Sequence, residues 1–270
     1  MRIKNYINGI EGVVAGGTAT VNVPINRRYH AIKAFVSATV GGGPSTDPTA
    51  ILDYVRQIVN GVIMRDLTPA QYIAIAQLNG QTVGAGELPT WYSEPWRASV
   101  IGEESTSWDL TGQTKMTLEF KFKSTAVSPS LALQASYDFG HNITNNARFD
   151  AIVKQLVQTY NAPSGKYDVT TLPIRFPIQR ILLAASTGTI NDVEIYRDNE
   201  KVHEGTAFEN LRWLADYGMD ASKFSYPIAF DYEQQISSPL LVDKDLNVRV
   251  NSSAANTLTV ITEHRANGFV

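Results

Sequence analysis

Alternating hydrophobic and polar residues are the dominant pattern along the chain. In the segment 115–123, Met116, Leu118, Phe120 and Phe122 are separated by Thr, Glu and Lys residues. Successive side chains of a strand point to opposite faces, so this alternation predicts a strand with one buried and one wet face. Similar patterns bounded by turn residues predict strands at residues 18–25, 30–40, 52–59, 62–66, 91–96, 131–139, 181–186, 192–197, 201–204, 225–232, 246–251 and 257–264.

Two capping boxes predict two short helices between these strands. The segment 68–71 reads Thr-Pro-Ala-Gln, and the segment 206–209 reads Thr-Ala-Phe-Glu. Each places a Thr at the N-cap and an acceptor side chain three residues later, where both bond to free backbone N–H groups. Gly80 and Gly218 supply the C-terminal stops. A third helix is predicted over residues 146–160, because its apolar residues fall on one helical stripe: Phe149, Ile152, Val153, Leu156 and Tyr160.

The capping boxes reveal an internal duplication with a spacing of 138 residues. A hairpin turn, a capped helix, a Gly stop and a Pro-led strand recur in the same order at that spacing: Asn60-Gly61 and Asp198-Asn199, Thr68 and Thr206, Gly80 and Gly218, Pro89 and Pro227. Outside this block the spacing changes. Segment 23–25 corresponds to 172–174, 149 residues later, and Leu131 corresponds to Leu258, 127 residues later. Changes of loop length between two copies of one unit would produce this drift.

The predicted fold is therefore all-β, with two tandem eight-stranded jelly-roll sandwiches and a few short helices. We expect an N-terminal arm over residues 1–12, a first jelly roll over 13–140, a helical linker over 141–165 and a second jelly roll over 166–270. Jelly rolls occur in viral capsid proteins, lectins and cupins, so the fold alone does not choose a function.

Composition narrows the choice. Hydrophobic residues make up 43% of the chain and charged residues 18%, which excludes an intrinsically disordered protein. A net charge of -3 argues against a surface that wraps nucleic acid, so no specific nucleic-acid partner is expected. The chain has no Cys, which excludes disulfides and thiolate chemistry. No apolar run reaches the length of a membrane-spanning helix.

Motifs for catalysis are missing from the sequence. The four histidines do not fall at metal-ligand spacings: His30, His141, His203 and His264. There is also no nucleophile elbow and no phosphate-binding loop. We therefore predict no catalytic, cofactor-binding or metal-binding residues, and a protein that is not an enzyme.

Three weaker candidates stay open. The loop 243–247 resembles the start of a calcium-binding loop but has Val248 and Ala254 where Gly and Glu belong, which leaves a structural calcium ion as an alternative. Carboxylates beside aromatic residues are typical of a sugar-binding cleft: Glu94, Glu103 and Glu104 with Trp91, Tyr92 and Trp96. The basic residues Arg2, Lys4, Arg27 and Arg28 offer modest positive charge toward phosphates.

Several segments resemble a known family. They are Val-Ala-Gly-Gly at 14–17, Val-Pro-Ile-Asn-Arg-Arg-Tyr at 23–29, the strand at 32–36 and the strand–Asn-Gly–strand hairpin at 55–63. Together with the tandem architecture, they resemble the double jelly-roll major capsid proteins of tailless bacteriophages with an internal membrane, of the corticovirus P2 type. No catalytic signature is among these motifs.

The resemblance implies an assembly function in the virion capsid. Three copies would form a trimeric, pseudo-hexameric capsomer, and capsomers would tile an icosahedral shell. The implied partners are other copies of the chain, penton or minor capsid proteins, and the viral membrane beneath. Residues 1–12 would contact the lipid or a neighbour through Ile3, Tyr6, Ile7 and Ile10. The alternative is a carbohydrate- or receptor-binding jelly-roll module, such as a virion spike or a lectin.

Overall fold

The computed structural model describes residues 2–97, 100–139, 151–231 and 239–269. The chain divides into two compact units, each of which is built from two β-sheets. The first unit comprises Met1–Gln77, Gln81–Ile152 and Asn267–Val270, and the second comprises Leu78–Gly80 and Val153–Ala266. None of the helices in the described part of the chain combines the length and the apolar character needed to cross a membrane.

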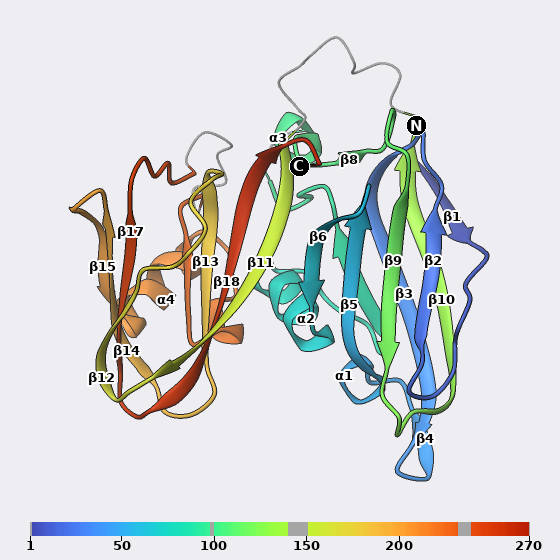
Figure 1. Ribbon diagram of the computed structural model, residues 1–270, viewed down its shortest axis with the longest axis horizontal. Helices are drawn as coiled ribbons and strands as arrows, with labels where there is room; N and C mark the ends of the chain where they lie inside the picture. The colour runs from blue at the N-terminus through green and yellow to red at the C-terminus, as the bar shows by residue number, and fades with distance from the viewer. Residues whose placement is uncertain (1, 98–99, 140–150, 232–238, 270) are drawn as a thin grey trace. The chain divides into compact units, whose positions relative to one another are not determined.

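The first unit has one larger and one smaller sheet (Figure 1). In the larger sheet, the central strand β3 (Arg28–Val40) pairs with β10, and β10 pairs with β1. Three further strands pair with β3. The members of this sheet are β1 (Ile3–Ile7), β10 (Val127–Asp138), β3, β4 (Gly43–Ser45), β7 (Glu87–Trp91) and β8 (Trp108–Asp109). The smaller sheet has the order β2 (Thr18–Val23), β9 (Met116–Phe122), β5 (Leu52–Val59) and β6 (Val62–Leu67).

The second unit repeats this arrangement (Figure 1). One sheet has the order β11 (Ala151–Ala162), β18 (Asn256–Asn267), β13 (Ile178–Ala185) and β16 (Tyr226–Ala229). The other has the order β12 (Gly165–Val169), β17 (Leu246–Ser252), β14 (Ile190–Arg197) and β15 (Glu200–Thr206). A single buried cluster draws side chains from both sheets, among them Ile181 of β13 and Val248 of β17. The second unit is therefore a sandwich with its core between the sheets.

The duplication holds at the level of strand register. Val55 pairs with Leu67 in the first unit, and Val193 pairs with Gly205 in the second, each 138 residues later. The irregularity between Gln57 and Ile58 also recurs, between Ile195 and Tyr196. The other two spacings appear between the sheet of β3 and β10 and the sheet of β13 and β18, where the pair Leu131 and Val36 corresponds to Leu258 and Ala185. These shared pairings confirm the predicted duplication.

The two capped helices and the hairpin turns before them also match between the units. In α2 (Pro69–Leu78), Gln71 N–H donates to the Thr68 hydroxyl at 3.3 Å and Thr68 N–H donates to the Gln71 side chain at 2.8 Å. In α4 (Ala207–Asp216), the same two bonds between Thr206 and Glu209 measure 3.3 and 2.9 Å. Both predicted helices are thus confirmed. Each hairpin turn has two residues with positive φ: Asn60 at 50° and Gly61 at 84°, Asp198 at 50° and Asn199 at 68°.

Three predictions are corrected by the structure. The predicted helix over residues 146–160 is wrong for residues 151–160, because Ala151–Ala162 forms strand β11. Residues 146–150 lie outside the described residues. The strand predicted at 91–96 is displaced, since β7 covers Glu87–Trp91. In the expected N-terminal arm, residues 3–7 form β1, which pairs with β10. Three short helices were not predicted: α1 (Pro48–Ile51), α3 (Val100–Glu104) and the 3-10 helix η1 (Ala221–Lys223). The predicted domain boundaries at residues 12, 140 and 165 stay predictions.

Candidate functional site

The carboxylates considered for a sugar-binding cleft are held in ion pairs with arginines. Glu103 and Glu104 accept from Arg2 at 2.6 and 3.1 Å. Glu94 accepts from Arg97 through two bonds of 2.6 and 3.1 Å, and both side chains are buried. A carboxylate fixed by a bidentate arginine is acceptor-only and poorly suited to acid–base catalysis. All three glutamates are therefore engaged in ion pairs within the first unit.

A second ion-pair network lies at the end of the larger sheet in the first unit. The guanidinium of Arg28 donates to Asp138 at 3.0 and 2.7 Å and to Glu104 at 3.3 Å, and His30 Nε2 lies 2.9 Å from Asp138. Burial works to lower the pKa of Arg28, but its hydrogen bonds to Asp138 and Glu104 outweigh it and the pKa is raised. Burial lowers the pKa of His30, although its bond to Asp138 works the other way. Arg28 thus faces carboxylates and is not available to a phosphate.

Of the aromatic residues considered for the cleft, Tyr92 belongs to the core, whereas Trp91 and Trp96 are half-buried. The rings of Tyr92 and Trp108 lie 4.5 Å apart, and their side chains are 1% and 0% exposed. The guanidinium of Arg65 lies 5.3 Å from the Tyr92 ring and 5.0 Å from the Trp108 ring. An arginine stacked on two buried rings contributes packing as well as charge. Tyr92 is therefore packed against the chain's own side chains and is not open to a sugar.

The predicted basic residues do not form a patch. The guanidinium of Arg27 stacks over the rings of Tyr137 and Phe139 at 4.4 and 5.9 Å, and Arg2 is paired with two glutamates. Lys4 lies on β1 and is exposed. These positions give no shared site for a phosphate.

The other two described histidines lie in hydrogen bonds with neighbouring residues. His203 Nε2 lies 3.1 Å from the Tyr226 hydroxyl, and His264 contacts the Phe176 carbonyl and the Thr262 hydroxyl. Burial lowers the pKa of both imidazoles, which keeps them neutral at pH 7. His141 lies outside the described residues.

The loop considered for calcium surrounds a carboxylate. The backbone N–H groups of Asp243, Lys244 and Asp245 donate to the Asp198 side chain at 3.2, 2.7 and 3.0 Å. These bonds lower the pKa of Asp198. Three donors aimed at one carboxylate bind an anion, so this backbone arrangement is the opposite of a cation-binding loop. Across the described ranges, no three His, Cys, Asp or Glu side chains gather in a group that could hold a metal ion.

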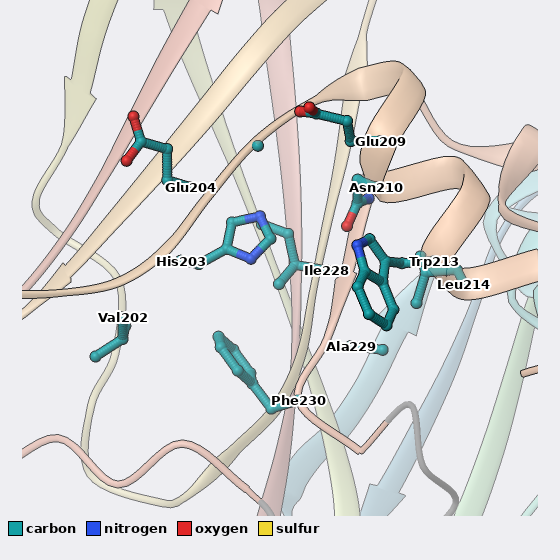
Figure 2. A pocket seen from close by; sticks show the side chains of 11 residues that line it. Val202, His203, Glu204, Glu209, Asn210, Trp213, Leu214, Ile228, Ala229 and Phe230 are labelled. Atoms are coloured by element: carbon teal, nitrogen blue, oxygen red, sulfur yellow. The ribbon is translucent and has the colours of Figure 1, made fainter. Parts of the chain in front are cut away.

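One surface hollow was not predicted from the sequence. It has a volume of about 480 Å³ and lies in the second unit between β15, α4 and β16 (Figure 2). Its wall is mostly apolar, with acidic residues at the rim: Val202, His203, Glu204, Gly205, Glu209, Asn210, Trp213, Leu214, Ile228, Ala229 and Phe230. Trp213 is 62% exposed, and Phe208 on the same helix, outside the hollow, is 73% exposed. Two large exposed aromatic residues on one helix are a signal of an interaction surface.

Two family models match this chain. The family models of the viral coat protein P2 N-terminal and C-terminal domains match residues 4–138 and 152–265. No curated protein matches the chain.

Several solved structures share the fold. The major capsid protein P2 from Bacteriophage PM2 is 20% identical with a TM-score of 0.85, over 98% of this chain and 97% of that one. A chain of the Sulfolobus Turreted Icosahedral Virus is 10% identical with a TM-score of 0.74, over 99% and 91%. The Faustovirus major capsid protein is 7% identical with a TM-score of 0.64, over 98% and 89%. Since the two matched family models together span most of the chain, it belongs to the viral coat protein P2 family, and its fold is that of the double jelly-roll capsid proteins.

Proposed function

We propose that three copies of this chain form a closed, pseudo-hexameric capsomer, and that such capsomers tile the icosahedral shell of a tailless bacteriophage. The observation that carries the proposal is the duplicated unit, whose strand order and register repeat within one chain. Two near-equivalent units per chain give six around a three-fold axis, which suits closed cyclic symmetry.

A structural role without catalysis is supported by the fate of the chemically active side chains. The described carboxylates near aromatic residues are paired with arginines. The described histidines form hydrogen bonds, with His30 and His264 buried and His203 half-buried. A shell protein works through large lateral surfaces and needs no reactive group. We therefore propose that the chain acts by assembly alone.

We also propose contacts with further virion components: penton or minor capsid proteins at the vertices and the membrane beneath the shell. Of the four N-terminal residues expected to reach a lipid or a neighbour, Ile7 is 6% exposed and belongs to the core. Tyr6, in contrast, is 60% exposed on β1. This distribution supports a contact with a protein neighbour through Tyr6.

The size of the purified protein in solution tests this function. Light scattering with negative-stain microscopy should show trimers of three 29.7 kDa chains, or particles, without added ligand. A chain that stays monomeric over the whole accessible concentration range would contradict the proposal.

A further inference from the structure

The two units bury their equivalent helices to very different extents. In α2, whose ten residues are all described, only Ala70 is exposed. In α4 six of ten residues are exposed, including Phe208 and Trp213. The two helices nevertheless have the same caps and the same place after the hairpin. The helix of the second unit is left uncovered in a single chain.

The outer faces of the equivalent sheets differ in the opposite direction: the face of the β13–β18 sheet in the second unit is buried, and the face of the β3–β10 sheet in the first unit is more exposed. Leu182 and Ile261 pair across β13 and β18 and are 0% and 1% exposed. Their strand neighbours Ile181 and Val260 belong to the core cluster between the sheets, so Leu182 and Ile261 point to the outer face. In the second unit, both faces of this sheet are already buried within one chain.

The equivalent outer face of the first unit is open. The positions that correspond to Leu182 and Ile261 are Lys33 and Gln134, which pair across β3 and β10, and both are only half-buried. Tyr6 pairs with Gln134 in the same row and is 60% exposed, and Phe35 on this face is 37% exposed. A single chain thus carries one uncovered helix and one uncovered sheet face, each with a covered counterpart in the other unit.

We propose that α4 of one copy docks on the outer face of the β1–β10–β3 sheet of the next copy, and that this contact is the seam of the capsomer. The inference rests on the proposed trimer and names the surfaces that build it. Such a contact is head-to-tail, because it joins two different surfaces, and repeated contacts of this kind close into a ring when the rotation allows.

The chemistry of the two surfaces is complementary. Glu204 and Glu209 lie at the rim of the hollow beside α4, and Glu204 pairs with Lys201 at 3.0 Å. The sheet face of the first unit carries Lys4, which is exposed, and Lys33, which pairs with Glu87 of the same sheet at 2.7 Å. Opposite charges around an apolar centre orient two surfaces and select the register of docking. Figure 2 shows Trp213, Leu214 and Phe230 around the open space that an apolar group of the neighbour would fill.

The first unit shows which kind of side chain fits such a hollow. The positions equivalent to His203 and Phe230 are Arg65 and Tyr92, and there Trp108 fills the space against both, fully buried. The second unit is thus built for an aromatic ring at the same place. Tyr6 is the most exposed aromatic residue on the opposing sheet face, so we assign its ring to the hollow of the neighbouring copy.

The absence of cysteine makes the seam directly testable by cross-linking. Trp213→Cys and Tyr6→Cys are purified separately, mixed, and treated with a short bismaleimide. A covalent pair of chains should form in the mixture, and mass spectrometry should place the cross-link between positions 213 and 6. Either variant alone should give far less of this product. The matched control mixes Trp213→Cys with Ile63→Cys, which places the second thiol on β6 at a side chain that is 43% exposed.

The outcomes separate this inference from the proposed function. Trimers by light scattering with no 213–6 product, or with as much product in the Ile63→Cys control, would overturn the seam and leave the trimer standing. Monomers under all conditions would overturn both. In addition, Trp213→Ala should weaken trimer formation by about 10-fold or more, as expected for a central aromatic residue, while Ile63→Ala should change it less than about 2-fold. Equal effects of the two would contradict the seam, and thermal unfolding shows that both variants fold.

Discussion

The exchange of Asp138 for Asn tests the buried ion-pair network of the first unit. The carboxylate of Asp138 receives two bonds from Arg28 and one from His30. The side chains of Arg28 and Asp138 are 9% and 13% exposed. Asp138→Asn keeps the size of the side chain and removes its charge, so the Arg28 guanidinium stays buried with Glu104 as its remaining carboxylate at 3.3 Å.

The expected effect follows from this burial. Removing one member of a buried ion pair costs about 3–5 kcal/mol, because the other charge is left without compensation. Asn retains one acceptor oxygen, so we expect the lower end, about 3 kcal/mol. At about 2–4 °C per kcal/mol for a unit of this size, the melting temperature of the first unit should fall by about 6–12 °C.

Differential scanning calorimetry measures this shift, and the second unit supplies a matched control. Arg249 and Asp168 form the same kind of pair across a strand ladder, with bonds of 2.8 and 3.4 Å, but their side chains are 33% and 44% exposed. Asp168→Asn should leave the melting profile nearly unchanged, since exposed pairs contribute little. Equal shifts for the two variants would refute the argument that burial decides the cost.

Three further predictions concern stability. Burial lowers the pKa of His30, His203 and His264 in the folded chain, so the unfolded chain binds protons more readily. The free energy of unfolding should therefore fall as the pH drops below about 6.5. Urea unfolding at pH 7.5, 6.5 and 5.5 measures this, and a constant free energy of unfolding would contradict it. Thr206→Ala should destabilise the second unit by about 1 kcal/mol through loss of the helix cap, whereas Thr206→Ser should not; thermal unfolding distinguishes them. Gly61→Ala should lower the free energy of unfolding by about 1 kcal/mol because φ is 84° at this position, although nothing lies within 4 Å of an added Cβ. Urea unfolding measures this, and stability equal to that of the parent chain would show that the turn relaxes.

The parts of the fold that sequence could predict are those set by local chemistry. A Thr cap with an acceptor three residues later has few other meanings, so both helices begin where predicted. The Asn-Gly and Asp-Asn turns tolerate positive φ, so the sequence predicts both hairpins and their 138-residue spacing. The alternating strands were recognised because one face of each is wet.

Strand β11 shows why the rest could not be predicted. Ile152 and Val153 are consecutive and both buried, so the start of this strand has apolar side chains on both faces. A strand covered on both faces loses its alternation, and a helical period then fits its apolar residues by coincidence. The hollow beside α4 was missed for a different reason, since β15, α4 and β16 line it together and only the fold brings Trp213 and Phe230 to the same space.

The pairing of first and last strands sets the order in which the chain can mature on the ribosome. Ile3 of β1 pairs with Tyr137 of β10, and β11 pairs with β18. The edge strand of each sandwich must therefore wait for a partner that is synthesised much later, which makes folding slow and dominated by long-range contacts. The first sandwich can nevertheless close before most of the second has been translated, so a nascent chain has one finished half while the other is still emerging.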